Sequence, residues 1–373
     1  MRFPGFEGEW ERMKIGEIGD VKMCRRIFNN ETSTVGDIPF FKIGSFGKNA
    51  DAFISRELYL DYKNRFPFPK KGDILISAAG TIGRTVVYKG ENAYYQDSNI
   101  VWINNDNSKV INEFLYYILQ IVKFHTEGGT IQRLYNSILK STKFRCSSII
   151  EQTKISSFLK LTDNRIQAQI KTIEELKSLK TGMSQRIFAR EIKFKDENEN
   201  YYPDWNTKRL GDILAYEQPT NYLVSSTEYN DEFCIPVVTA GKTFVLGFTD
   251  ETEGIFKKEK LPVIIFDDFT TSCQYVNFPF KTKSSAMKIL KIKNDDNIKF
   301  IYEAMQNVRY EVGGHRRHWI SVFSNIKILI PSLPEQQKIA NFLSAIDKKI
   351  EIETQILKKL KEQKKFFLQN LFV

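Results

Sequence analysis

A segment of the chain occurs twice, and this internal repeat constrains the fold more than any other feature of the sequence. Residues 151–159 read EQTKISSFL, and residues 335–343, 184 positions later, read EQQKIANFL. The alignment continues without a gap to Phe188 and Phe372, and 13 of its 38 residue pairs are identical. Two copies separated by half of the chain predict a duplicated molecule rather than a solenoid of many repeats. Functional groups are therefore expected in pairs.

Both copies space their apolar residues by alternating four and three, which is the seam spacing of a coiled coil. Each copy is expected to form a helix about 55 Å long, at 1.5 Å per residue. Because a long helix in water gains most of its stability by burying an apolar stripe, the two helices are expected to pair. The expected seam residues are Ile155, Leu159, Ile166, Ile173, Leu176, Ile339, Leu343, Ile346, Ile350, Leu357 and Leu360.

Polar residues interrupt the seam at matched positions of the two copies. Gln169 matches Glu353, and Lys180 matches Lys364. Shared polar seam residues are typical of positions that set the register of a coiled coil. A lysine whose stem lies along apolar surface while its ammonium stays in water gives the same pattern. Both interpretations stay open, and the pattern does not determine whether the helices run parallel or antiparallel.

A weaker similarity extends upstream of each helix, where residues 10–18 align with residues 205–213. The repeating unit is thus a globular region followed by a helix, with globular regions of normal domain length. Short strand-like runs between turn residues predict mixed α/β domains and an α+β fold class. The expected strands include 73–77, 85–88, 99–103 and 263–266, and amphipathic helices are expected at 113–124 and 300–308.

The composition favours a polyanionic partner. The net charge of +10 and the pI near 9.1 point most directly to nucleic acid. The four cysteines, at positions 24, 146, 234 and 273, form no Cys-x-x-Cys pair, so reduced thiols in a cytoplasmic protein are expected. The sequence contains no apolar run of membrane length and no signal peptide.

Motifs for catalysis are incomplete throughout the sequence. Gly241-Lys242-Thr243 resembles the end of a phosphate-binding loop, but Pro236 stands where that pattern needs glycine. Residues 277–280 read NFPF, which departs from the Asn-Pro-Pro-Phe motif of amino-methyltransferases at its second position. The sequence contains only three histidines, so a catalytic triad with a histidine as general base is poorly supported.

Metal sites are also poorly supported. His315 and His318 have the spacing of metal ligands, but the matching loop of the first repeat carries Thr130 and Arg133 instead. Asp267-Asp268 lacks a third carboxylate in nuclease-like order, so we interpret the pair as surface or turn carboxylates. No catalytic residue, cofactor site or metal site is therefore predicted in this chain.

Several loops carry side chains suited to DNA. The loop at 313–319 places cationic donors beside Trp319 after two glycines, and residues 128–133 match it in the first repeat. Such donors suit phosphate contact and guanine reading by arginine. Residues 77–84 form a turn whose glycines allow close approach of a ligand, although an ordinary turn has the same pattern. The candidate DNA-binding residues are Lys42, Ser45, Ser77, Thr81, Arg84, Gln132, Arg133, Lys242, Thr243, His315, Arg316, Arg317 and His318.

A family resemblance rests on short segments at the ends of the expected long helices and within the globular regions. They are residues 331–339, which read PSLPEQQKI, the helix end at 368–372, the mid-chain copy at 149–152, Trp10 with 14–18, Trp205 with 209–213, and residues 72–77. This set resembles the specificity (S) subunits of type I restriction-modification enzymes over essentially the whole chain. The mid-chain copy departs from the pattern, because CSSI stands where Pro-x-x-Pro precedes Glu335.

The resemblance implies that two target-recognition domains, at 1–148 and 192–332, each read one half of a split site in double-stranded DNA. It implies that long helices at 149–191 and 333–373 form an antiparallel coiled coil that spaces the domains, giving a pseudo-two-fold repeat. Such a subunit is not catalytic. It docks two methyltransferase subunits, which use S-adenosylmethionine, and restriction subunits, which use ATP and Mg²⁺.

Two other classes stay open on the residues alone. An autonomous DNA methyltransferase or nuclease is distinguished by binding of S-adenosylmethionine, or nicking of DNA, by the chain alone. A coiled-coil assembly scaffold without base readout is distinguished by an affinity for DNA that depends on salt but not on sequence.

Overall fold

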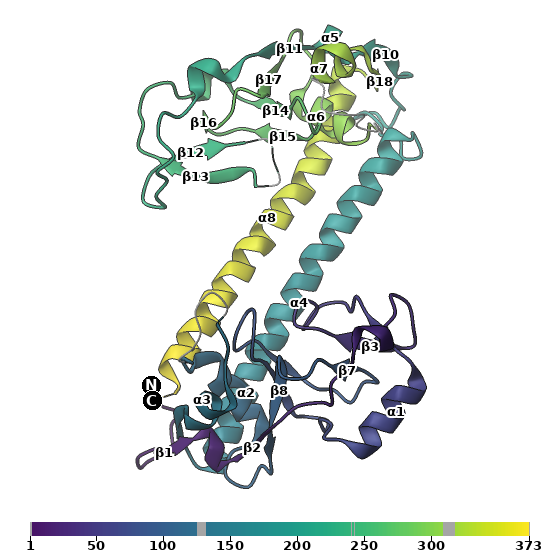
Figure 1. Ribbon diagram of the computed structural model, residues 1–373. Helices are drawn as coiled ribbons and strands as arrows, with labels where there is room; N and C mark the ends of the chain where they lie inside the picture. Colours follow the sequence, from purple (N-terminus) through teal and green to yellow (C-terminus); the bar gives the residue numbers. More distant parts are fainter. Residues whose placement is uncertain (1, 125–131, 240, 242, 309–317, 373) are drawn as a thin grey trace. The chain divides into compact units, whose positions relative to one another are not determined.

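The computed structural model describes residues 2–124, 132–239, 241, 243–308 and 318–372. The chain divides into two compact units (Figure 1). Unit 1 comprises Met1–Ile170 with Gln355–Val373, and unit 2 comprises Lys171–Thr354. Both combine helices with antiparallel strands, as expected for an α+β protein.

Within its described residues, unit 1 contains three sheets. The largest is antiparallel in the order β2-β8-β5-β6, formed by Gly19–Lys22, Ile100–Asn105, Ile74–Ser77 and Thr85–Val87. The second has the order β4-β3-β7, formed by Phe53–Ile54, Ile38–Phe41 and Tyr94–Tyr95, and its β3–β7 pair is parallel. The third pairs β1 (Glu11–Lys14) with β9 (Lys143–Cys146). The short helices are α1 (Arg56–Arg65), α2 (Asn112–Ile121) and α3 (Asn136–Ser141).

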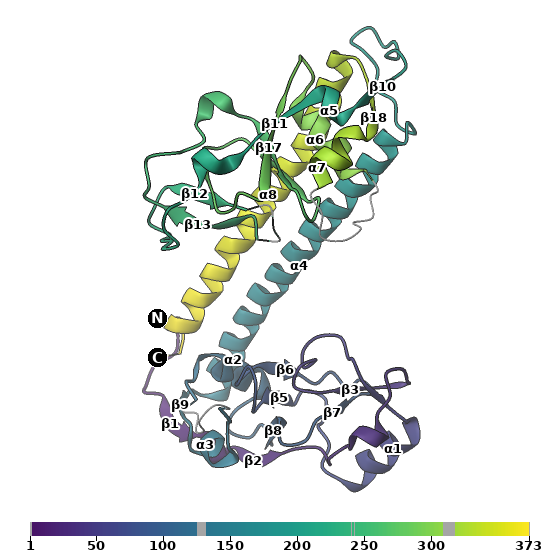
Figure 2. The ribbon, with the colours of Figure 1, turned by 45° about the horizontal axis from the view of Figure 1, so that its top comes forward.

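Figure 2 labels the unit 1 order β2-β8-β5-β6. The same strand orders recur in unit 2, whose strands are labelled in Figure 1. The four-stranded sheet is β11-β17-β14-β15, formed by Leu214–Glu217, Met287–Ile292, Val263–Asp267 and Cys273–Val276. The three-stranded sheet is β13-β12-β16, formed by Val245–Thr249, Ile235–Val238 and Lys281–Thr282, and its β12–β16 pair is also parallel. β10 (Asn206–Arg209) pairs with β18 (Lys327–Ile330). The short helices are α5 (Leu210–Ile213), α6 (Ile298–Gln306) and α7 (His318–Ser321).

The four-stranded sheet of unit 1 is buried on both faces. Successive side chains of a strand point to opposite faces, so Ile74 and Ile76 of β5 enter one core while Leu75 enters the other. The first core packs against α2 and the first turns of a long helix, and the second packs against β3 and β7. In unit 2, Ile264 and Ile265 divide in the same way between two cores.

Two long helices contain the repeated segment. They are α4 (Ile149–Phe188) and α8 (Leu333–Asn370). Helix α4 ends before residue 191 because Arg190 adopts a positive φ of 64°, and the main-chain N–H groups of the two following residues donate to Arg186. Of the expected seam residues, Leu176, Ile346, Ile350 and Leu357 are half-buried, and Ile155, Leu159, Ile166, Ile173, Ile339, Leu343 and Leu360 are buried.

The polar seam lysines form specific ion pairs. In unit 1, Nζ of Lys364 lies 2.6 Å from Oδ1 of Asp163. In unit 2, Nζ of Lys180 lies 2.7 Å from Asp347 on α8 and 3.0 Å from Glu303 on α6. Both lysines are about four-fifths buried. These contacts favour the register-setting interpretation over a lysine whose ammonium stays in water.

The glutamine of the repeated Glu-Gln pair at the start of each long helix has a structural role. Gln152 accepts a hydrogen bond from the main-chain N–H of Ile111 (3.0 Å) and donates to the carbonyl of Ser147 (2.8 Å). Gln336 accepts from Asn297 (2.8 Å) and donates to the carbonyl of Pro331 (3.0 Å). Both glutamines are buried. Each therefore joins the start of a long helix to the residue that precedes α2 or α6.

Candidate nucleic-acid interface

The turn between β5 and β6 carries three of the predicted DNA-binding residues. Ser77 is buried, and its hydroxyl accepts a hydrogen bond from the main-chain N–H of Arg84 (2.9 Å) and contacts the carbonyl of Thr81. The turn needs glycine at position 83, where φ is +79° and a Cβ would lie 3.0 Å from the ring of Phe124. Ser77 therefore shapes the turn, and its contact with DNA stays a prediction. Thr81 is exposed.

Arg84 is oriented by the turn and by a neighbouring segment. One guanidinium nitrogen donates to the carbonyl of Phe46 (2.9 Å), and another contacts the hydroxyl of Thr81 (3.3 Å). A guanidinium has five N–H donors in a rigid plane, so these two contacts fix its plane while leaving donors for a ligand. This geometry is typical of an arginine prepared for bidentate recognition.

The segment around Phe46 contains two further candidates. Ser45 is buried, and its hydroxyl accepts a hydrogen bond from the main-chain N–H of Lys42 (3.2 Å). The hydroxyl of Ser45 thus stabilises the turn that contains Ser45, just as the hydroxyl of Ser77 stabilises the β5–β6 turn. The side chain of Lys42 is 41% exposed, and its ammonium lies 4.0 Å from Asp51, at the limit of an ion pair. Lys42 is thus free to contact a phosphate.

A third segment adjoins the same turn. The main-chain N–H of Leu134 donates to the carbonyl of Ala78 (2.9 Å), which places the exposed residues Gln132 and Arg133 beside the β5–β6 turn. The glycine pair of the predicted loop lies outside the described residues. The structure therefore brings together three segments that are distant in sequence, and we call residues 42–48, 78–84 and 132–134 the unit 1 loop cluster.

Most candidates of unit 2 cannot be placed in the same way. Lys242, His315, Arg316 and Arg317 lie outside the described residues. His318 is the first residue of α7, and nothing is described of its side chain. Thr243 is exposed in the segment that connects β12 and β13.

One interpretation of unit 2 needs correction. Trp319 is not available beside the cations of a DNA-binding loop, because it is buried and its ring packs edge-on against Phe266. Asp268 lies in the turn after β14, as one of the two expected alternatives, although it is buried beside Lys288 (3.6 Å) and accepts a hydrogen bond from the main-chain N–H of Trp319 (2.8 Å). Asp267 is the turn carboxylate that we expected, since it accepts N–H groups of the turn after β14.

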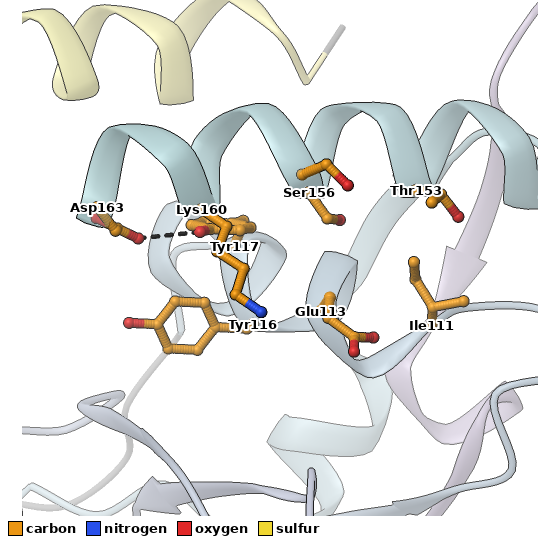
Figure 3. Close-up of a pocket in the computed structure, with 9 residues that line it drawn as sticks. Ile111, Glu113, Tyr116, Tyr117, Thr153, Ser156, Lys160 and Asp163 are labelled. Atoms are coloured by element: carbon orange, nitrogen blue, oxygen red, sulfur yellow. Dashed lines mark hydrogen bonds between the residues drawn. The ribbon is translucent and has the colours of Figure 1, made fainter. Parts of the chain in front are cut away.

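A groove of about 550 Å³ lies between α2 and the first turns of α4 in unit 1 (Figure 3). Tyr117 donates a hydrogen bond to Asp163 at its edge (2.9 Å). Burial, together with the Asp163 charge, raises the pKa of Tyr117, so its phenol remains a donor. The groove is lined by Ile111, Glu113, Tyr116, Tyr117, Thr153, Ser156, Ser157, Lys160 and Asp163. Sequence reasoning missed it because its two walls are distant in the chain.

Within the described residues, no group of three or more His, Cys, Asp or Glu side chains is arranged to hold a metal ion. Across the same residues, no helix combines the length and the apolar character needed to cross a membrane.

A family model described as the type I restriction modification DNA specificity domain matches the chain twice, at residues 7–178 and 202–362. The chain belongs to this family. The resemblance to specificity subunits is thereby confirmed, and the two matches correspond to the two repeats found in the sequence.

Relatives of this specificity family match part of the chain closely. A protein of Haemophilus influenzae, named as a type I restriction enzyme specificity subunit, is 56% identical over 148 residues, covering 39% of this chain and 38% of the relative. A type I restriction enzyme specificity subunit of Escherichia coli is 50% identical over 133 residues, covering 35% of this chain and 33% of the relative. These two matches thus span 38% and 33% of the respective relatives.

A similarity in structure extends further. The crystal structure of an S subunit of a type I restriction-modification system from M. genitalium matches with a TM-score of 0.63. The match covers 100% of this chain and 99% of that chain at 19% sequence identity. It shows that the two chains share a fold.

Proposed function

We propose that this chain is the sequence-specific DNA-binding subunit of a type I restriction-modification complex and reads a two-part target. The observation that carries the proposal is the double match to a DNA specificity domain, together with one strand order that recurs in both units. The corresponding turns of the two units carry different side chains. A shared frame with different polar groups suits a reader of two different half-sites.

The two recognition domains in this proposal comprise residues 1–148 and 192–332. In the first, the unit 1 loop cluster presents Arg84, Arg133 and Lys42, which suit guanine reading and phosphate contact. In the second, Thr243, Lys242 and the segment 315–318 are the corresponding candidates. The net charge of +10 adds a long-range attraction to DNA that depends on salt.

We propose that residues 149–191 and 333–373 form an antiparallel coiled coil that spaces the two domains. Within unit 1, Phe158 packs against Phe367 with ring centroids 4.8 Å apart, and Asp163 pairs with Lys364. The position on α8 thus falls as the position on α4 rises, which supports an antiparallel pair. Half-sites read by one protein tend to lie about 34 Å apart or more, a distance that helices of this length can span.

Catalysis in this proposal belongs to partner subunits. Two methyltransferase subunits carry S-adenosylmethionine, and restriction subunits carry ATP and Mg²⁺. The exposed side chains of Ile150 and Leu161 on α4 provide an apolar surface for such a partner. They are eleven positions apart, which is about three helical turns, so they lie on one face of α4.

In vitro selection tests the proposal. Full-length chain, with a methyltransferase partner, is expected to enrich two short fixed motifs at a fixed separation from a library of random DNA duplexes. Enrichment of one continuous motif, or of none, contradicts it. Leu161→Glu is expected to weaken co-purification of the methyltransferase subunit, while Leu179→Glu on the same helix serves as a matched exposed control.

A further inference from the structure

The turn between β14 and β15 in unit 2 is the structural counterpart of the β5–β6 turn in unit 1. It joins the corresponding strands of the four-stranded sheet. The main-chain N–H of Asp268 donates to Ala286, just as that of Ala78 donates to Asn99. In unit 2, the main-chain N–H of Trp319 donates a hydrogen bond to the side chain of Asp268. In unit 1, the main-chain N–H of Leu134 donates to the carbonyl of Ala78 at the corresponding place. The two turns therefore occupy one place in two copies of the same frame.

The main chain of the β14–β15 turn, which carries an exposed aromatic side chain, is held by several hydrogen bonds. Oδ1 of Asp267 accepts the main-chain N–H groups of Phe269 (2.8 Å) and Thr270 (3.2 Å), and the N–H of Asp267 donates to Ser272 (2.8 Å). Asp268 is anchored by Lys288. The side chain of Phe269 is nevertheless 39% exposed. A single exposed phenylalanine is common on protein surfaces, but here it stands on a rigid turn that matches the Arg84 turn.

The chemistry of this turn differs from that of its counterpart. Residues 267–272 read DDFTTS and contain no lysine or arginine. Both carboxylates are engaged within the protein, so the groups left for a ligand are the Phe269 ring and the hydroxyls of the threonines and Ser272. In the major groove, a phenylalanine ring matches the 5-methyl group of thymine, whereas arginine matches guanine.

We propose that Phe269 determines specificity by contacting the methyl group of a thymine in the half-site bound by unit 2. This inference rests on the proposed function and deepens it. The contact discriminates thymine from cytosine and also from uracil, which lacks only the methyl group. Thr270, exposed beside Phe269, remains available for a phosphate or base contact.

Uracil substitution tests this contact. The site selected by the full-length chain is synthesised with each thymine replaced in turn by uracil, and the affinities of wild type and Phe269→Ala are measured. Loss of one buried methyl group is expected to weaken wild-type binding about four-fold at one position in one half-site. Phe269→Ala is expected to bind the thymine and uracil duplexes equally. Phe269→Leu, which keeps an apolar side chain, retains a preference for thymine.

A matched control is Phe366→Ala, which removes an exposed phenylalanine from α8 and should leave the uracil effect unchanged. The inference is overturned if wild type tolerates uracil at every position, if the half-site of unit 2 contains no thymine, or if Phe269→Ala stays as sensitive as wild type. Absence of any sequence preference in the wild-type chain contradicts the proposed function itself. The two failures are therefore distinguishable.

Discussion

Lys364 and Asp163 form an ion pair of 2.6 Å between the two long helices within unit 1. Tyr117 donates to the same carboxylate (2.9 Å), so a residue of α2 joins this pair to the domain. In unit 2, Lys180 and Asp347 form the corresponding pair, and each residue lies 184 positions from its counterpart. The duplication has thus preserved one specific seam contact in both units.

Removal of Asp163 tests the importance of this contact. Asp163→Ala leaves the largely buried Lys364 and the Tyr117 hydroxyl without their acceptor, so we expect the free energy of unfolding to fall by about 1–3 kcal/mol. Urea denaturation of the full-length chain measures the change. The matched control is Lys171→Ala, whose exposed partner Glu175 lies 3.6 Å away and which should cost about 0.5 kcal/mol or less. Equal effects of both variants argue against a structural role for the seam pair.

Gln336 is expected to be sensitive to substitution, because its side chain is buried and hydrogen-bonded to the main chain of two other segments. Gln336→Leu leaves the main-chain N–H of Asn297 and the carbonyl of Pro331 without a side-chain partner in a buried site. We expect a loss of about 2–4 kcal/mol in the free energy of unfolding, because each buried unsatisfied group costs about 1–3 kcal/mol. Gln363→Leu, at an exposed position of α8, is the control. A stability of Gln336→Leu close to wild type contradicts the assigned role.

The carboxylate of Glu251 gives unit 2 a pH-dependent contribution to stability. The pKa of Glu251 lies below 4.5 in the folded state. The largest cause is a hydrogen bond from Lys281, and the main-chain N–H groups of Ser226 and Ser225 contribute as well. A carboxylate whose pKa is lower in the folded than in the unfolded state stabilises the protein at any pH above its unfolded-state pKa. This contribution is lost as the pH falls through its folded-state pKa. Glu251→Gln should therefore destabilise at pH 7 and converge with wild type below pH 4.5. A difference in unfolding free energy that stays constant with pH contradicts this assignment.

Arg84 and Lys42 are expected to affect DNA binding in different ways. Arg84→Ala should cost about 1–3 kcal/mol and relax preference at one base pair of one half-site, because an oriented arginine reads guanine. Lys42→Gln should weaken binding to all sequences alike, as expected for the loss of a phosphate contact. It should also reduce the slope of log affinity against log salt concentration by about one. Affinity measured against single-base variants at several salt concentrations separates them. A uniform loss with Arg84→Ala contradicts its role in base reading.

The parts of the fold that sequence patterns predicted are those encoded locally. The spacing of four and three persists through each copy of the repeat, so both long helices and their seam were predictable from Ile155 onward. The strands at β5, β8 and β14 were also predictable, because short runs of buried residues end at turns. Helix α2 begins at Asn112, within one residue of expectation, but ends at Ile121 rather than Phe124.

The parts that could not be predicted depend on contacts between distant segments. Asp268 lies in a turn as expected, but its burial could not be predicted, because Lys288 and the N–H of Trp319 reach it only in the folded domain. The same contact buries Trp319, which the sequence had placed in a DNA-binding loop. Ser77 and Ser45 likewise bind their own turns. Sequence reasoning named candidate residues in each segment of the unit 1 loop cluster, but it predicted neither that these segments meet nor which hydroxyls the fold engages.

The most direct test of the central claim is a methylation map of cells that express a grafted chain with its methyltransferase partner. Residues 1–148 are replaced by the corresponding domain of a relative with a different target, and single-molecule sequencing identifies the methylated motif. The account predicts that one half of the motif changes, while the other half and the separation between the halves are retained. A motif altered in both halves, or unaltered in both, contradicts it.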